Sequence, residues 1–194
     1  MASPETSQGT VIVTGASSGI GHAVCHRLAA ADRSIITVDV GEQPPDLAPE
    51  KHFICDLSNE EEIDAMVEVL SEDFDFQSIA ALVNVAGVPG TRPAAQVLDV
   101  NLLAVRYLSR CLVPHLSPGS SIVNVGSISG NGWQERLHMY QSLLELDNAD
   151  ARAWWSDRSK SVGVDPYTFS KEAVIVWSML HAGELRGTGI RCNV

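Results

Sequence analysis

Basic residues are scarce in this chain. It has 13 lysines and arginines against 24 aspartates and glutamates, which gives a formal net charge of −11 at pH 7. Nucleic acids select partners with basic patches, so this balance argues against a nucleic-acid partner. Lysine occurs at only three positions, 51, 160 and 171. A lysine that falls at a functional spacing is therefore less readily explained by chance.

Cysteine pairs and long apolar runs are also missing. The four cysteines form no Cys-x-x-Cys pair, so we expect reduced side chains in a cytoplasmic protein, with neither a disulfide frame nor a zinc site. No stretch of about 18 uninterrupted apolar residues occurs, so neither a membrane span nor a membrane partner is expected. Residues 1–8 lack the basic and apolar regions of a signal peptide and are expected to be a frayed tail.

A glycine-rich turn follows the first apolar run of the chain. The run at 11–13 predicts a buried strand, and an alanine-rich helical pattern begins at Ile20. Between them, Gly15, Gly19 and Gly21 would let the backbone turn sharply and approach a pyrophosphate closely. The helix that follows would direct free N–H groups and its positive dipole end at the phosphates. The pattern predicts a nucleotide-binding loop, and a plain structural turn is the alternative.

The second apolar run ends in an acid. Residues 35–38 predict a strand, and Asp39 follows it about 20 residues beyond the glycine turn. A carboxylate at this place can bind both hydroxyls of an adenosine ribose and repel the additional phosphate of NADP. No arginine or lysine stands at 17, 18, 40 or 41 to receive that phosphate. We therefore expect NAD as the cofactor in preference to NADP, unless Asp39 only caps a turn.

Strands and helices alternate along the rest of the chain. Further strand patterns, nearly continuous in apolar residues, lie at 52–55, 79–83, 120–125 and 189–194, and a long helix is predicted over 95–114. This alternation predicts an α/β fold with a three-layer, Rossmann-like, doubly wound parallel sheet, in a single domain over residues 1–194. The polar residues singled out here follow strand ends, where such sheets bind ligands.

The glycine spacing resembles that of a known family. Gly-x-x-x-Gly-x-Gly at 15–21, preceded by Thr14, is similar to the signature of the short-chain dehydrogenase/reductase family. Residues 84–87 resemble the family's Asn-Asn-Ala-Gly element, with Val85 in place of the second asparagine. The resemblance implies that Asp56 contacts the adenine ring, although a solvated acid at a strand end is an equal alternative. The expected cofactor-binding set is Gly15, Ser17, Ser18, Gly19, Ile20, Gly21, Asp39, Asp56, Leu57, Asn84, Ala86, Gly87, Tyr167 and Lys171.

The family's chemistry requires a Tyr-x-x-x-Lys pair, and two tyrosines compete for it. Tyr140 lies 13 residues after Ser127, a common separation in the family, but Leu144 stands four residues later. Tyr167 has Lys171 at that spacing, which places both side chains on one face of a helix. An ammonium beside the phenol lowers a pKa that is near 10 when free. We therefore expect Tyr167 to be the general acid/base.

Two further catalytic residues are implied by the resemblance. Ser127 occupies the place of the family's catalytic serine, with Gly126 where a serine is frequent and Ser129 as a less favoured neighbour. Asn101 falls inside the predicted helix, where the family has an asparagine that holds a water beside the catalytic lysine. The alternative for Asn101 is an exposed polar residue.

Residues 131–164 form an insertion between the serine and the tyrosine. It contains three of the four tryptophans, at 133, 154 and 155, and several leucines. The insertion predicts additional core, a hydrophobic substrate wall or a subunit contact. A long insert here resembles a subgroup containing bacterial 3α-hydroxysteroid dehydrogenase/carbonyl reductase and coniferyl alcohol dehydrogenase, which implies a bulky hydrophobic or aromatic substrate. Members of the family continue for roughly 60 residues beyond position 194, so a final strand and a substrate lid are expected to be missing here.

The expected function is an NAD-dependent oxidoreductase that interconverts a secondary or primary alcohol with a ketone or aldehyde. The expected partners are that small-molecule substrate and other copies of the chain, in a homodimer or homotetramer. The alternative is a catalytically silent dinucleotide-binding sensor or scaffold on the same fold. A sensor needs only the glycine loop, so the set Ser127, Tyr167, Lys171 and Asn101 favours the enzyme.

Overall fold

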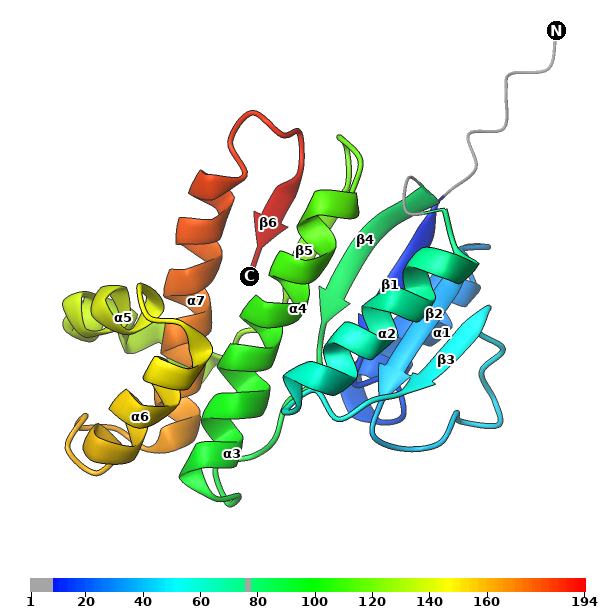
Figure 1. The fold of residues 1–194 in the computed structure, drawn as a ribbon. Coiled ribbons are helices and arrows are strands. Elements are labelled where there is room, and N and C mark those ends of the chain that lie inside the picture. The colour runs from blue at the N-terminus through cyan, green and yellow to red at the C-terminus, as the bar shows by residue number, and fades with distance from the viewer. Residues whose placement is uncertain (1–8, 76–77) are drawn as a thin grey trace, which may run out of the picture.

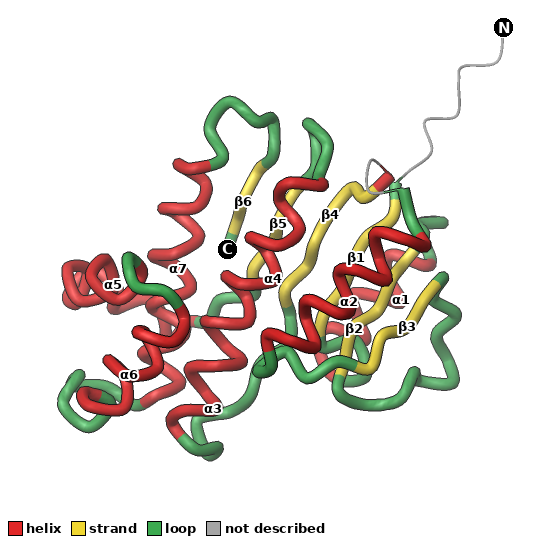
Figure 2. The backbone as a smooth tube through the Cα atoms, in the orientation of Figure 1, coloured by secondary structure: helices red, strands yellow, loops and turns green. Residues whose placement is uncertain are grey.

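One parallel β-sheet organises the chain. The computed structural model describes residues 9–75 and 78–194, so the expectation for residues 1–8 lies outside the described part. Within that part the strand order is β3-β2-β1-β4-β5-β6 (Figures 1 and 2), which is the order of a Rossmann sheet. The predicted fold class is therefore confirmed. The strands are β1 (Thr10–Thr14), β2 (Ile35–Asp39), β3 (Lys51–Ile54), β4 (Ile79–Asn84), β5 (Ser121–Asn124) and β6 (Arg191–Asn193).

The register of the strands brings their carboxyl ends to one edge. Thr14 of β1 pairs with Val38 of β2, and Asn84 of β4 pairs with Asn124 of β5. The chain order reverses direction between β1 and β4, because β1 is followed by β2 on one side and β4 lies on the other. Ligands bind beyond the strand ends at such a switch point. The glycine turn and the segment after β4 therefore face each other there.

Helices cover both faces of the sheet (Figure 1). On one face, α2 (Glu60–Asp73) and α4 (Ala104–Leu112) bury a cluster that includes Ile12, Ile63 and Leu108. On the other face, α1 (Gly19–Ala29) packs Cys25 against Val11 and Val13. The alternating directions of successive side chains in β1 explain why one strand serves both clusters.

The helix predicted over 95–114 is not one regular helix. It begins as α3 (Ala94–Leu98), passes through a π-helical turn at Asp99–Leu103, and resumes as α4 before a 3₁₀ turn at Val113–His115. The prediction of a continuous α-helix was therefore wrong. A π turn inserts one extra residue into a helix and reorients the side chains around it. Asn101 lies inside this turn and is buried.

The predicted insertion packs against the last long helix. It contains the 3₁₀ segment Ile128–Arg136 in large part, α5 (Leu137–Leu144) and α6 (Asn148–Arg158), and α7 (Pro166–Glu184) follows it. α5 and α6 lie at the end of the molecule opposite β3 (Figure 1). A third apolar cluster joins them to α7, with Leu143, Trp155 and Phe169 in it. No helix among residues 9–75 and 78–194 is long and apolar enough to cross a membrane.

Candidate active site

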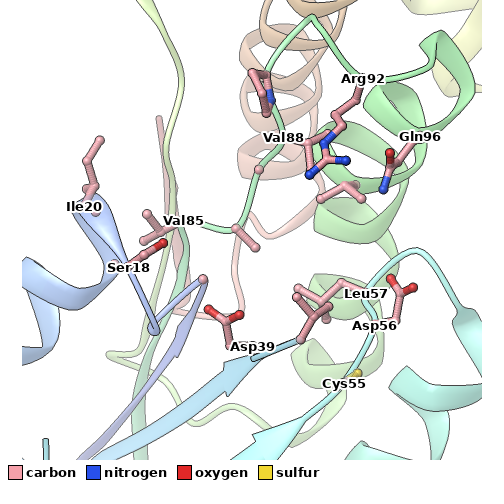
Figure 3. A pocket seen from close by; sticks show the side chains of 18 residues that line it. Ser18, Ile20, Asp39, Cys55, Asp56, Leu57, Val85, Val88, Arg92 and Gln96 are labelled. Carbon is pink, nitrogen blue, oxygen red and sulfur yellow. The ribbon is translucent and has the colours of Figure 1, made fainter. Parts of the chain in front are cut away.

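Two adjoining cavities open beyond the strand ends. The larger has a volume of about 740 Å³ and extends from the glycine turn past Asp39 to the segment after β4 (Figure 3). The smaller, of about 470 Å³, is lined by residues that include Tyr167 and Lys171. The residues that line both are Ile20, Val85, Gly87, Val88 and Pro89. These shared walls make the two cavities parts of one cleft.

The glycine turn forms the floor of the larger cavity, and two of its glycines cannot be replaced. A Cβ on Gly15 would lie 2.7 Å from the Cα of Ala86, and a Cβ on Gly21 would lie 2.1 Å from the carbonyl oxygen of Gly15. Gly15 and Gly19 also have positive φ values of 67° and 55°, which glycine adopts without strain. The turn therefore packs against the segment after β4 at backbone-to-backbone distance.

The start of α1 offers unpaired N–H groups to this cavity. The N-cap residue Ser18 makes no side-chain capping hydrogen bond, and the larger cavity is lined by Ser18, Gly19, Ile20 and Gly21. A helix N-terminus with free donors and a positive dipole end is suited to bind phosphate. The residues present therefore fit the diphosphate of a dinucleotide. Ser17, which was expected to bind the cofactor, is not among the residues that line this cavity. Its N–H donates to Asp39 and its hydroxyl donates to the carbonyl of Glu42.

Thr14 joins the glycine turn to the segment after β4. Its hydroxyl oxygen accepts hydrogen bonds from the N–H groups of Val85 and Ala86, at 3.0 and 3.1 Å. Ala86 and Gly87 of the Asn84–Gly87 element line the larger cavity. Asn84 itself is buried below them, where its amide donates to Asn124 and Ser109. Asn84 is therefore placed to support the strand ends and not to line the cavity.

Asp39 is held at the end of β2 by backbone donors. One carboxylate oxygen accepts from the N–H of Ser17 at 2.8 Å, and the other accepts from the N–H of Gly41 at 3.0 Å. The carboxylate lines the larger cavity (Figure 3). These two bonds fix the orientation of the carboxylate. Each oxygen keeps a second lone pair free to accept from a ligand hydroxyl. Asp56 and Leu57 line the same cavity further along, past the end of β3.

Tyr167 and Lys171 stand at the start of α7, as the spacing predicted. Asp165 caps this helix by accepting from the N–H groups of Tyr167 and Thr168, and Pro166 occupies its first position. The Lys171 ammonium lies 5.9 Å from the centre of the Tyr167 ring, and both residues line the smaller cavity. The same ammonium donates to the carbonyl of Val125 at 2.7 Å, which fixes α7 to the end of β5.

Ser127 follows β5 and is not among the residues that line either cavity. It is half-buried, and it caps the 3₁₀ segment by accepting from the N–H of Ser129 at 3.2 Å. Gly126, directly before it, lines the smaller cavity with Tyr167 and Lys171. The structure thus brings the segment that carries Ser127 to the helix that carries the tyrosine and the lysine.

Asn101 is a buried residue, which removes the alternative of an exposed one. Its amide forms a two-way pair with the backbone of Val88: the side-chain oxygen accepts from the N–H at 2.7 Å, and the side-chain nitrogen donates to the carbonyl at 3.0 Å. The nitrogen also lies 3.2 Å from the hydroxyl of Ser170, next to Lys171. Asn101 therefore connects the π turn, the cavity wall at Val88 and the start of α7.

Comparison with known proteins settles the family. A profile described as short chain dehydrogenase matches residues 9–142. The chain belongs to the short-chain dehydrogenase family. Coniferyl-alcohol dehydrogenase of Pseudomonas sp. (strain HR199) is 35% identical over 184 residues, covering 94% of this chain and 69% of that protein. The short-chain dehydrogenase/reductase olcF of Penicillium canescens is 30% identical, covering 95% of this chain and 66% of that protein.

Solved structures show the same relationship. The 3-alpha-hydroxysteroid dehydrogenase of Pseudomonas sp. B-0831, complexed with NADH, has a TM-score of 0.74 at 27% identity, covering 94% of this chain and 69% of that one. A 4-hydroxyisoleucine dehydrogenase complexed with NADH and succinate has a TM-score of 0.69 at 26% identity, covering 94% and 76%. The chain thus spans about two thirds to three quarters of these relatives. All of these relatives are named as dehydrogenases or reductases. This member of the short-chain dehydrogenase family is therefore an oxidoreductase.

Tyr140, the competing tyrosine, is fully buried away from the two cavities. Its hydroxyl donates to the carboxylate of Glu172, and burial together with that carboxylate raises the pKa of the phenol well above 10. Glu172 also accepts two hydrogen bonds from the guanidinium of Arg136, at 2.8 and 2.6 Å. Tyr140, Leu143, Leu144 and Trp155 are all core residues. For them the structure favours additional core over a substrate wall.

Two residues of the cavity wall gave no signal in the sequence. Arg92 and Gln96 lie on the side of the larger cavity across from Asp39 (Figure 3). Among the described residues that line this cavity, Arg92 alone carries a positive charge, beside the acids Asp39 and Asp56. No motif marks either residue. They reach the cavity because the chain after Val88 leads into α3.

Lys171 gives the protein a specific dependence of stability on pH. Burial lowers the pKa of this ammonium from 10.5 to about 8, so between pH 8 and 10.5 the unfolded chain binds more protons than the folded one. The free energy of unfolding contributed by this group therefore rises with pH through that window, by an amount on the order of 3 kcal/mol. The raised pKa values of the buried thiols of Cys25, Cys55 and Cys192 lower stability over the same pH range, but they do so equally in wild type and in Lys171→Met. Urea unfolding of the ligand-free proteins at pH 7.5 and 10 should therefore give a change in the free energy of unfolding that is more positive in wild type than in Lys171→Met. Equal slopes in the two proteins would contradict the assignment.

Proposed function

We propose that the chain is an NAD-dependent oxidoreductase that interconverts a secondary or primary alcohol with a ketone or aldehyde. The observation that carries this proposal is the position of Tyr167 and Lys171 on one face of α7, lining a cavity continuous with the glycine-floored one. The cofactor is supported by two relatives of known structure that were solved with NADH. When bound, its nicotinamide accepts the hydride in alcohol oxidation and supplies it in reduction.

Tyr167 is the proposed general acid/base. In oxidation its phenolate would take the proton of the alcohol's hydroxyl while the carbon that bears this hydroxyl gives up a hydride, so that the O–H and C–H bonds break and a C=O bond forms. Lys171 holds a positive charge beside the ring, which stabilises the phenolate. In the reverse direction Tyr167 returns its proton to the carbonyl oxygen.

Ser127 and Asn101 complete the proposed catalytic set. Ser127 donates a hydrogen bond to the substrate oxygen and stabilises the negative charge that develops there. Asn101 positions Val88 on the cavity wall through two hydrogen bonds and lies against Ser170 at the base of α7. In this proposal a water at Asn101 passes protons to Lys171.

The preference for NAD over NADP is assigned to Asp39. Its carboxylate is fixed by two backbone N–H groups and would accept from the ribose hydroxyls while repelling a phosphate at the same place. Asp39→Ser is expected to lower kcat/KM for NAD at least about tenfold and to raise the ratio of NADP to NAD use, because it removes a charge-assisted bond and the repulsion. Steady-state kinetics with both cofactors measure this. Asp32→Ser, an exposed acid outside both cavities, is the matched control.

The proposed substrate is a bulky hydrophobic or aromatic alcohol. Two relatives support this class: the coniferyl-alcohol dehydrogenase at 35% identity and the 3-alpha-hydroxysteroid dehydrogenase at a TM-score of 0.74. The test is an NADH-absorbance screen of aromatic, terpenoid and steroid alcohols. Turnover that disappears in Tyr167→Phe while NAD binding is kept supports the enzyme. NAD binding with no turnover of any alcohol or ketone would favour a silent sensor or scaffold.

We propose that residues 1–194 act as one domain in a cytoplasmic homodimer or homotetramer. The apolar cluster shared by α5, α6 and α7 supports treating the insertion as part of that domain. Light scattering coupled to size exclusion measures the assembly. A monomer at micromolar concentration would contradict it.

A further inference from the structure

Two histidines and an aspartate meet outside the cleft. His22 and His26 are one helical turn apart on α1, so their side chains project from the same face. Asp46 approaches them from the loop between β2 and β3. The Nε2 atom of His22 lies 3.1 Å from one carboxylate oxygen of Asp46, and the Nε2 atom of His26 lies 3.0 Å from the other. The three ligand atoms all lie within 4.8 Å of one another.

Asp46 stands on an anchored turn. The N–H of Leu47 donates to the carbonyl of Pro44 at 3.1 Å, which closes the turn around Asp46, and the Gln43 amide donates to the carbonyl of Leu47 at 2.9 Å. Leu47 is buried in the same apolar cluster as Cys25, which lies on α1 between the two histidines. The core contact thus holds the loop against α1, the helix that carries the imidazoles.

We propose that His22, His26 and Asp46 bind a divalent transition-metal ion of the zinc class. Imidazole nitrogens and a carboxylate are ligands that zinc, cobalt and nickel share, whereas magnesium and calcium prefer oxygen alone. Zinc takes such ligands at about 2.0–2.2 Å in a tetrahedron, so the present separations close around an ion with small side-chain rotations. Water takes the fourth position, because the site is open to solvent.

Surface histidine–carboxylate pairing alone would hold these groups only weakly. An exposed ion pair contributes about 0–1 kcal/mol, and here each imidazole faces one oxygen of a carboxylate that is itself half exposed. A metal ion satisfies all three groups at once, releasing any proton from each coordinating Nε2.

Metal binding would join two segments that form the cofactor cavity. α1 begins at the glycine turn, and the loop that carries Asp46 begins just after Asp39 and Val40, both of which line that cavity. An ion at this place would therefore act as a cross-link behind the proposed ribose site. The site does not contribute a ligand to the cleft itself.

The test uses the full chain, freed of metal with a chelator and titrated with Zn²⁺ in calorimetry and thermal unfolding. We expect saturable binding of one ion per chain, and at 100 times Kd the ratio of folded to unfolded protein should rise about 100-fold. Hydrogen exchange should slow in residues 41–50. His26→Gln and Asp46→Asn should each weaken binding at least about tenfold.

His138→Gln is the matched control, since His138 is exposed on α5 and lies outside the cluster. His26 is chosen over His22 because His22 directly follows Gly21, which belongs to the glycine floor of the cavity. Circular dichroism of each variant without metal checks that it folds. If His26→Gln does not fold, Asp46→Asn, which keeps the shape of the side chain, still tests the site. Absence of saturable binding, or equal binding by wild type and both site variants, would overturn the proposal.

Discussion

Replacing Tyr167 with phenylalanine should reduce kcat about 10³-fold while leaving Kd for NAD within about twofold. General acid/base groups contribute about 10²–10⁴-fold to catalysis, and phenylalanine keeps the ring that lines the smaller cavity but has no proton to exchange. Cofactor binding rests mainly on the larger cavity, so it should survive. Stopped-flow measurement of NADH formation gives kcat, and fluorescence titration gives Kd.

Tyr140→Phe is the control that separates the two tyrosines. The Tyr140 hydroxyl is buried on Glu172 and lies outside both cavities. Its loss should cost about 1–2 kcal/mol of stability and leave kcat within about twofold. A large fall in kcat for Tyr140→Phe, with full activity in Tyr167→Phe, would reverse the assignment.

Arg136→Leu should lower the free energy of unfolding by about 3–5 kcal/mol. The substitution leaves the carboxylate of Glu172, whose side chain is 1% exposed, buried without its cation. An uncompensated buried charge is among the largest penalties a single substitution produces. Because this ion pair joins the insertion to α7 directly beside Lys171, the loss should also loosen the helix that carries the proposed acid/base. Urea denaturation at neutral pH measures the change.

The double variant Arg136→Leu with Glu172→Leu tests whether the unpaired buried carboxylate of Glu172 causes the loss of stability. It removes both charges, so it should recover a part of the stability that Arg136→Leu loses. Arg158→Leu is the surface comparison, since Arg158 is exposed and its guanidinium lies over the ring of Trp154 at 5.3 Å, and it should change stability by less than about 1 kcal/mol. A double variant less stable than the single one would show that packing, and not the buried charge, dominates.

Local patterns were sufficient for most of the fold. Strand, glycine turn and helix are set by residues close together in the sequence, so β1, α1 and the acid at the end of β2 were predicted where the structure has them. The prediction of one long helix failed at Asp99–Leu103, where a π turn carries Asn101 and the Asn101 side chain binds the backbone of Val88. That hydrogen bond joins the segment after β4 to the π turn, and helical periodicity cannot predict a contact between two segments.

The insertion shows the same limit. Its leucines and tryptophans predicted burial but not the surface they would cover, and hydrophobic side chains suit a core, a substrate wall and a subunit contact equally. In the structure Leu143 and Trp155 lie in the core, in one apolar cluster with Phe169 of α7, and the Trp155 ring packs on the Phe169 ring. The burial of Glu172 was not predicted, because an acid in a helix is ordinarily a surface residue.

The sequence alone determined the family signature: the spacing of the glycines, the acid after the second strand, and the tyrosine four residues before the lysine. Each depends on backbone geometry over a few residues, which amino-acid type controls directly. Only the tertiary structure decided that Lys171 donates to the carbonyl of Val125, that Arg92 reaches the cavity, and that Asp46 meets two histidines of α1. Those contacts arise from packing the sheet edge and its loops, where residues far apart in the chain become neighbours.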